Sequence, residues 1–170
     1  NGKQIRVNWI QRGFAAAAVI SLLVVSFIWV FSDNTRVIET ATAEVRTVIL
    51  PDSSLVILNA LSKISFDEDD WEENRKLDLE GEAFFQVAKG SDFSVVTGQG
   101  IVTVLGTQFN VKDRKAYFEV ICYEGLVSVN NQNSEEKLKK GYMFRLVDGE
   151  ITYEQNEFYN FPHLLKNESA

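Results

Sequence analysis

This sequence is poor in the residues on which most enzyme sites depend. It has one cysteine, Cys122, and one histidine, His163, in 170 residues. A single cysteine cannot close a disulfide within the chain, and one Cys with one His cannot supply the four ligands of a zinc site. The one possible base for a Ser/His/Asp triad, His163, lies in the tail beside Pro162, and the sequence contains no GxxxxGK[ST] phosphate loop. We therefore expect no conventional enzyme activity, no cofactor and no metal site, and we interpret Cys122 as a small buried hydrophobic residue.

Acidic residues outnumber basic ones outside the first twelve residues. Lys3, Arg6 and Arg12 give residues 1–12 a local charge of +3, whereas the chain from Asp33 onward carries 24 acidic and 14 basic side chains. Binding to a phosphate backbone requires a basic face, which such a body lacks. Nucleic acid is therefore not expected as a partner.

One apolar run stands out near the amino terminus. Residues 14–31 contain no charged side chain, and as a helix they would span about 27 Å, close to the hydrocarbon thickness of a bilayer. A signal peptide would have a shorter apolar region ending in small residues, whereas this run ends in Trp29, Val30 and Phe31. A buried core helix would show a polar face. The run predicts a lipid-embedded transmembrane helix over residues 13–32.

The flanking charges predict the orientation of this span. The basic residues precede it, and the basic flank of a span stays in the cytoplasm. Residues 1–12 are then a cytoplasmic juxtamembrane remnant, and the rest of the chain lies outside. In a cell with an outer membrane, this places the body in the periplasm, anchored in the inner membrane. Residues 33–42 are polar and are interpreted as a tether, and residues 154–170 as a tail too short to form a domain.

Residues 43–153 show the pattern of an all-β domain. The most informative stretch, residues 77–125, consists of short runs rich in Val, Ile, Phe, Tyr and Thr, each ended by glycine or by a polar cluster. Runs that recur about every eight to twelve residues predict an antiparallel-rich sandwich or a solenoid-like body. Two β-hairpins are predicted: one around residues 51–54 and one around Asp148-Gly149.

Several residues within this body carry specific expectations. Gly81 and Gly106 interrupt strand-like runs and predict bends at positive φ. Phe84 and Phe85 are adjacent in a strand and should point to opposite faces, with at least one of them deeply buried. The acidic residues at 67–73 lack the register of a calcium-binding loop, so they predict a solvated loop from which Trp71 packs back onto the body.

Three motifs in order resemble the periplasmic domain of FecR-like transmembrane anti-sigma regulators. They are GEAFFQVAK at 81–89, VTVLGTQFNV at 102–111 and YEGLVSV at 123–129. The resemblance extends over about residues 46–143 and includes LPDSS at 50–54, in which Ser53 replaces the glycine usual in the family. Since serine tolerates turns, this departure indicates a changed turn geometry.

The resemblance implies a signalling function. Such a protein holds an extracytoplasmic-function sigma factor at the cytoplasmic face and responds to the signalling domain of an outer-membrane TonB-dependent transducer. Its sigma-binding domain would precede Asn1, and a carboxy-terminal subdomain would follow Phe161. The alternative from the same features is a membrane-anchored periplasmic β scaffold for envelope assembly or transport, which would need an apolar groove or an open sheet edge.

One chemical hypothesis concerns the peptide bond between Gly106 and Thr107. The Thr107 hydroxyl could attack the Gly106 carbonyl carbon and form an ester, and hydrolysis of this ester would cut the chain. Some FecR-like regulators show such self-cleavage at a Gly-Thr pair, and glycine permits the backbone distortion that the reaction needs. The structural alternative, which the sequence favours, is that Gly106 forms a bulge and Thr107 lies in a strand.

Overall fold

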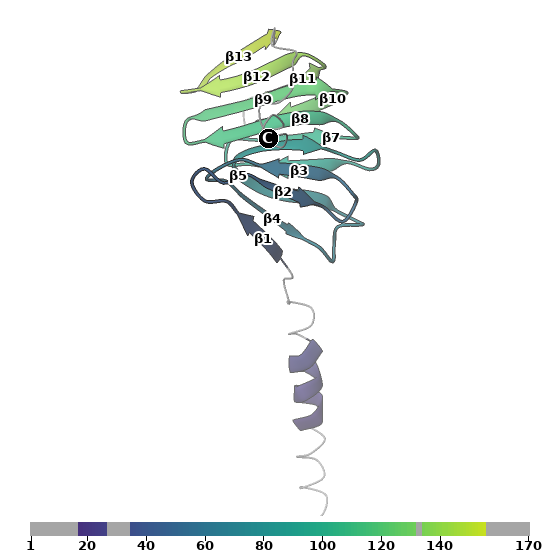
Figure 1. Ribbon diagram of the computed structural model, residues 1–170. Helices are drawn as coiled ribbons and strands as arrows, with labels where there is room; N and C mark the ends of the chain where they lie inside the picture. The colour runs from purple at the N-terminus through teal and green to yellow at the C-terminus, as the bar shows by residue number, and fades with distance from the viewer. Residues whose placement is uncertain (1–16, 27–34, 132–133, 156–170) are drawn as a thin grey trace, which may run out of the picture. The chain divides into compact units, whose positions relative to one another are not determined.

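The computed structural model describes residues 17–26, 35–131 and 134–155 (Figure 1). Residues 17–26 are helical and belong to one unit, and the β body belongs to a second unit that begins at Thr35. The rest of the predicted span, the predicted remnant at 1–12 and the tail beyond Gln155 lie outside the described residues. Among those that are described, no helix is both long enough and apolar enough to cross a membrane.

The β body confirms the all-β prediction. Its described residues form thirteen strands: β1 (Thr35–Glu39), β2 (Arg46–Ile49), β3 (Leu55–Leu58), β4 (Lys63–Asp67), β5 (Arg75–Gln86), β6 (Phe93–Val96), β7 (Ile101–Val104), β8 (Gln108–Arg114), β9 (Tyr117–Glu124), β10 (Leu126–Asn130), β11 (Glu135–Lys139), β12 (Tyr142–Val147) and β13 (Glu150–Gln155).

These strands form two layers that share β5. The first layer has the order β1-β4-β5-β6-β7-β10-β11, and the second has the order β2-β3-β5-β8-β9-β12-β13. The pairing of β5 with β6 is parallel, and the other pairings of the two layers are antiparallel. The two layers are parts of one continuous sheet that curls around a single core like a half-barrel, so the structure supports the all-β class rather than the specific sandwich or solenoid-like form.

Strand β5 passes from one layer to the other at Gly81. Before this residue β5 pairs with β4 and β6, and after it β5 pairs with β3 and β8. Gly81 has φ of +99°, and a Cβ at this position would lie 2.4 Å from the Ser62 Oγ. The same Ser62 hydroxyl accepts a hydrogen bond from the Glu82 N–H at 2.9 Å. The predicted bend at Gly81 is confirmed, and the space there excludes any side chain.

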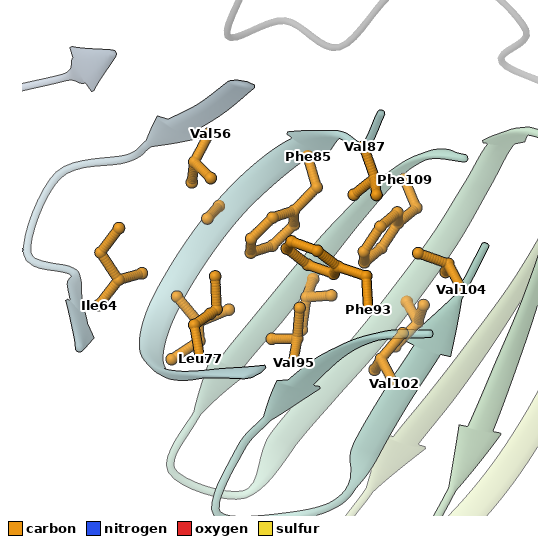
Figure 2. Packing of buried hydrophobic residues seen from close by; sticks show 14 of the residues in the cluster. Val56, Ile64, Leu77, Phe85, Val87, Phe93, Val95, Val102, Val104 and Phe109 are labelled. Atoms are coloured by element: carbon orange, nitrogen blue, oxygen red, sulfur yellow. The ribbon is translucent and has the colours of Figure 1, made fainter. Parts of the chain in front are cut away.

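Aromatic rings from three strands meet at the centre of the core (Figure 2). Phe85 of β5 stacks on Phe109 of β8 with ring centroids 5.0 Å apart, and it meets Phe93 of β6 edge-on at 6.2 Å. Since β6 belongs to the first layer, these rings join both layers. Each such aromatic pair contributes about 0.5–1.5 kcal/mol beyond the burial of its area. Phe84 is also buried, but it belongs to a separate small cluster on the opposite face, as the alternation predicts.

Trp71 and Cys122 are both buried, as predicted. Trp71 leaves the acidic loop and packs edge-on against Phe66 at 5.2 Å and against Phe93 at 5.8 Å. Cys122 lies in the main core, where burial raises the pKa of its thiol to about 11. A thiol with so high a pKa is almost wholly protonated at neutral pH, so Cys122 is a packing residue and not a nucleophile.

The predicted hairpins are confirmed, but the predicted tether is partly wrong. Strands β2 and β3 pair around residues 51–54, and β12 and β13 pair around Asp148 and Gly149, whose φ angles of 50° and 87° both suit a type I′ turn. Within the predicted tether at 33–42, however, Thr35–Glu39 form β1 and pair with β4. The body therefore begins before residue 43. Strand β1 was not predicted from the sequence because Ile38 is its one buried residue. Its sequence therefore shows no alternation of apolar and polar side chains.

Candidate functional site

Gly106 lies in the connection between β7 and β8, against the loop that follows β5. Its φ is +149°, and a Cβ at this position would lie 2.9 Å from the Lys89 Cα. The carbonyl groups on either side of it are hydrogen-bonded to that loop: Leu105 O accepts from the Gly90 N–H at 3.1 Å, and Thr107 O accepts from the Val87 N–H at 3.0 Å. Glycine is required here by close backbone approach as well as by its positive φ, which confirms the predicted bend.

Thr107 is buried beside a second glycine with positive φ. Its hydroxyl donates a hydrogen bond to the Leu126 carbonyl oxygen at 3.2 Å. A Cβ added at Gly125 would lie 3.0 Å from the Thr107 Oγ1. A side chain at position 125 would therefore crowd the Thr107 hydroxyl. An amide carbonyl oxygen is a very weak base, so this hydrogen bond does little to activate the hydroxyl as a nucleophile. The geometry therefore accounts for Thr107 as a structural residue, although the bond that self-cleavage would break is held in a bent segment.

A mostly apolar groove of about 470 Å³ runs along this segment. Leu105 and Leu126 line it and are 60% and 50% exposed. Lys89 and Asp92 line the same groove from the loop between β5 and β6. The Gly106-Thr107 segment is thus beside an accessible surface, with one basic and one acidic side chain at its border.

An ion pair not found by the sequence analysis connects three other segments. Asp52, in the turn between β2 and β3, accepts from the Arg75 Nε at 2.8 Å, and the Arg75 Nη2 also contacts this carboxylate. The Arg75 side chain is 7% exposed and that of Asp52 is 14% exposed. Arg75 further donates to Ala88 O at 2.9 Å and to Ser91 O at 2.7 Å. The pair therefore fastens the LPDSS turn to the start of β5 and to the loop that follows β5.

The protonation of Asp52 reflects this setting. Burial by itself raises the pKa of the Asp52 carboxyl, but hydrogen bonds from Ser54 and Arg75 outweigh that effect and lower the pKa below its usual value. The Ser54 backbone N–H and hydroxyl donate to the two carboxylate oxygens at 3.0 and 2.7 Å. The Ser54 hydroxyl in turn accepts from the Ala88 N–H at 3.0 Å. The Asp52 carboxylate is thus stabilised in its charged form, in which it accepts the hydrogen bonds that fix the turn between β2 and β3.

The adjacent acids Glu80 and Glu82 do not form a two-carboxylate site. The Glu80 side chain is 81% exposed and belongs to the part of β5 in the first layer. Glu82 follows the bend, has a 6% exposed side chain and pairs with Lys112 at 3.7 Å in the second layer. The bend at Gly81 separates the two carboxylates, so acid–base chemistry that needs both of them is not supported.

A second polar cluster lies on the outer face of the second layer. Glu119 accepts from Arg145 Nη2 at 2.8 Å and from the Tyr117 hydroxyl at 2.5 Å. Hydrogen bonding to Glu119 raises the pKa of Arg145, and burial raises the pKa of the Tyr117 phenol. Alternation along β9 could have placed Tyr117 and Glu119 on one face, but the partner on β12 depends on strand order. The cluster stabilises the pairing of β9 with β12.

The family of the chain follows from comparison with known proteins. A family model described as FecR protein matches residues 36–128. Two crystal structures of a proposed anti-sigma factor from Parabacteroides distasonis ATCC 8503, at 2.50 and 1.65 Å resolution, match with a TM-score of 0.68 and 31% identity. Each match covers 71% of this chain, and the chain spans 60% and 59% of the two solved chains. A search of curated proteins finds no match.

Proposed function

Since this chain belongs to the FecR protein family, we propose that it is the membrane-anchored sensor part of an anti-sigma factor. The observation that carries the proposal is the position of the family match. Residues 36–128 cover most of the stretch from β1 to β10 of the β body, and the solved structures that resemble it come from a proposed anti-sigma factor. The Asp52–Arg75 ion pair and most of the core lie within this matched region.

The membrane topology is part of the proposal. Residues 13–32 cross the inner membrane once, with residues 1–12 in the cytoplasm and the β body in the periplasm. The uncharged run and the basic flank of Lys3, Arg6 and Arg12 support this topology. Strand β1 begins at Thr35, so a few residues separate the span from the folded body.

The proposed partners lie on opposite sides of the membrane. On the cytoplasmic side the protein holds an extracytoplasmic-function sigma factor, and in the periplasm the β body responds to the signalling domain of an outer-membrane TonB-dependent transducer. The described body offers surfaces for such a contact, among them the groove beside Leu105 and Leu126 and the open edges at β1, β2, β11 and β13. The proposal requires no catalysis by this chain.

The proposal can be tested in cells with a reporter gene under the control of the sigma factor. In the complete protein, deletion of residues 35–155 should abolish the change in reporter output that follows transducer activation, since the sensor is lost. Lys76→Met, at an exposed position of β5, is the control that leaves the β body intact. Reporter output that still follows the transducer after the deletion would contradict the signalling role. A defect in envelope permeability with normal reporter output would favour the scaffold alternative.

A further inference from the structure

An apolar patch is buried on the side of the second layer that faces away from the core. Phe84 is 1% exposed and Ile57 is 3% exposed, and the two are paired across β5 and β3. Leu55 and Tyr123 pack against them, with the Phe84 and Tyr123 rings 5.9 Å apart. These residues alternate with Val56 and Phe85, whose side chains point into the main core. We call Leu55, Ile57, Phe84, Asn110 and Tyr123 the outer patch.

Such burial is unusual for this kind of face. An antiparallel sheet with one face on the core normally presents a polar, solvated face on the other side. In the residues that the structure describes, the strands form two layers, and none of them lies over the outer face of the second layer. Phe84 and Ile57 nevertheless have almost no exposed surface. The outer patch therefore has the character of an interface.

Asn110 adds a polar requirement to this interface. It faces Phe84 across the β5–β8 pairing and is 4% exposed. Its Nδ2 donates to the Glu82 Oε1 at 3.4 Å, but its Oδ1 has no hydrogen-bond partner. A buried carbonyl oxygen without a donor is costly, so an occupant that brings an N–H group would be favoured. Burial also raises the pKa of the Tyr123 phenol to about 12, which is consistent with a poorly solvated face.

We propose that the outer patch is the docking site of residues 156–170 of the same chain. This segment directly follows β13, which ends at Gln155. Its sequence, NEFYNFPHLLKNESA, places three aromatic side chains and two leucines within eight residues, at 158–165. Apolar side chains of this kind match the patch around Phe84 and Ile57, and backbone N–H groups of an extended segment can supply the donor that the Asn110 Oδ1 lacks.

The segment is long enough to reach the patch. Strand β13 is the edge of the second layer, and β12, β9 and β8 lie between it and β5. Four strand spacings of about 4.8 Å give a path of about 19 Å across the sheet. A segment of 15 residues extends at most about 50 Å. The apolar residues at 158–165 can therefore lie over β5 and β8 without any change in the β body.

The consequence is a third layer made by the carboxy-terminal segment. It would cover the second layer from β13 to β5 and fix the direction in which the chain leaves the β body. The inference goes beyond the proposed signalling role and does not depend on it, because it concerns contacts within one chain. Any domain that follows in a longer protein would then be fastened to the outer face rather than attached by a free linker.

Photo-crosslinking of the full chain in membranes tests this docking. A benzoylphenylalanine at position 123 should crosslink to a peptide within residues 156–170 of the same molecule, as identified by mass spectrometry. The same probe at position 55 provides an independent attachment point if replacement of Tyr123 disturbs the sheet. A probe at Thr103, on the outer face of the first layer, is the control and should give no such product.

The mass of the crosslinked product distinguishes the possible occupants of the outer patch. Replacement of Phe158 and Phe161 by serine in the same chain should reduce the crosslink from position 123 at least fivefold, while the Thr103 control stays unchanged. A product with the mass of two chains would show that a second copy covers the patch, and a product with another protein would show a foreign partner. Either of these, or the absence of any product with residues 156–170 from both probe positions, would overturn the proposal.

Discussion

The Arg75 guanidinium and the Asp52 carboxylate form a buried ion pair that joins the turn between β2 and β3 to the start of β5. Asp52 belongs to the turn between β2 and β3, Arg75 begins β5, and the guanidinium also reaches the carbonyl oxygens of Ala88 and Ser91. Arg75 further lies over the Phe93 ring, 5.5 Å from its centroid. The pair therefore connects the turn, the shared strand and the aromatic core through one side chain.

We expect the β body to fold without the apolar run. All residues of the main core lie between Ile38 and Leu146, so a fragment that begins at Asn34 retains them. Far-ultraviolet circular dichroism of this fragment should show a spectrum dominated by strand, with a cooperative urea transition. A mainly helical spectrum, or unfolding without a transition, would show that the body depends on the preceding segment.

Removal of one partner of the ion pair should destabilise this fragment strongly. We expect Arg75→Met and Asp52→Asn each to lower the free energy of unfolding by about 3 kcal/mol, because each leaves a buried group of the other residue without its partner. Urea denaturation measures this. Lys76→Met, at an exposed position beside Arg75, is the matched control and should change stability by less than about 0.5 kcal/mol. Equal effects at 75 and 76 would contradict the role of the pair.

The same pair predicts a dependence of stability on pH. Because the pKa of Asp52 is lowered in the folded state, its contribution is present above the unfolded value of about 3.9 and is lost as the pH falls through the folded value. The difference in unfolding free energy between wild type and Asp52→Asn should be constant from about pH 7 to pH 5 and should shrink below about pH 4. A difference that stays constant down to pH 2.5 would show that the charge of Asp52 is not responsible.

The Gly106-Thr107 segment should stay intact in the purified protein. The Thr107 hydroxyl donates to a carbonyl oxygen, which does not activate it, so we expect one chain after prolonged incubation. Gly106→Ala should destabilise the body because its Cβ would meet the Lys89 backbone, whereas Gly149→Ala, with open space at the Cβ, should cost about 1 kcal/mol. Gel electrophoresis and mass spectrometry report cleavage. Two fragments divided before Thr107 in wild type, and none in Thr107→Ala, would restore the self-cleavage hypothesis.

The sequence predicted features that depend on local chemistry. The bends at Gly81 and Gly106, the hairpin at Asp148-Gly149 and the burial of Trp71 all follow from residue type and short spacing, and the structure confirms them. Each of these needs information from only a few neighbouring positions. Local patterns were therefore sufficient for the all-β body and for its strongest turns.

Features that depend on strand order were not predictable in this way. Asp52 and Arg75 are 23 residues apart, and their pairing requires β3 to lie beside β5, which no periodicity shows. Strand β1 has one buried side chain, Ile38, so its sequence is indistinguishable from a polar tether. Deep burial of at least one of Phe84 and Phe85 was expected, but the separation of Phe84 from the main core was visible only once β5 was seen to join both layers.

The membrane topology tests the central proposal most directly. A reporter enzyme that works only outside the cytoplasm, fused to the full chain after Asn130 at the end of β10, should be active in intact cells. A reporter that works only in the cytoplasm should be silent at the same position and active when fused within residues 1–12. Fusion proteins of equal abundance on immunoblots make the two reporters comparable. Activity of the cytoplasmic reporter after Asn130 would place the β body inside the cell and would contradict its role as an extracytoplasmic sensor.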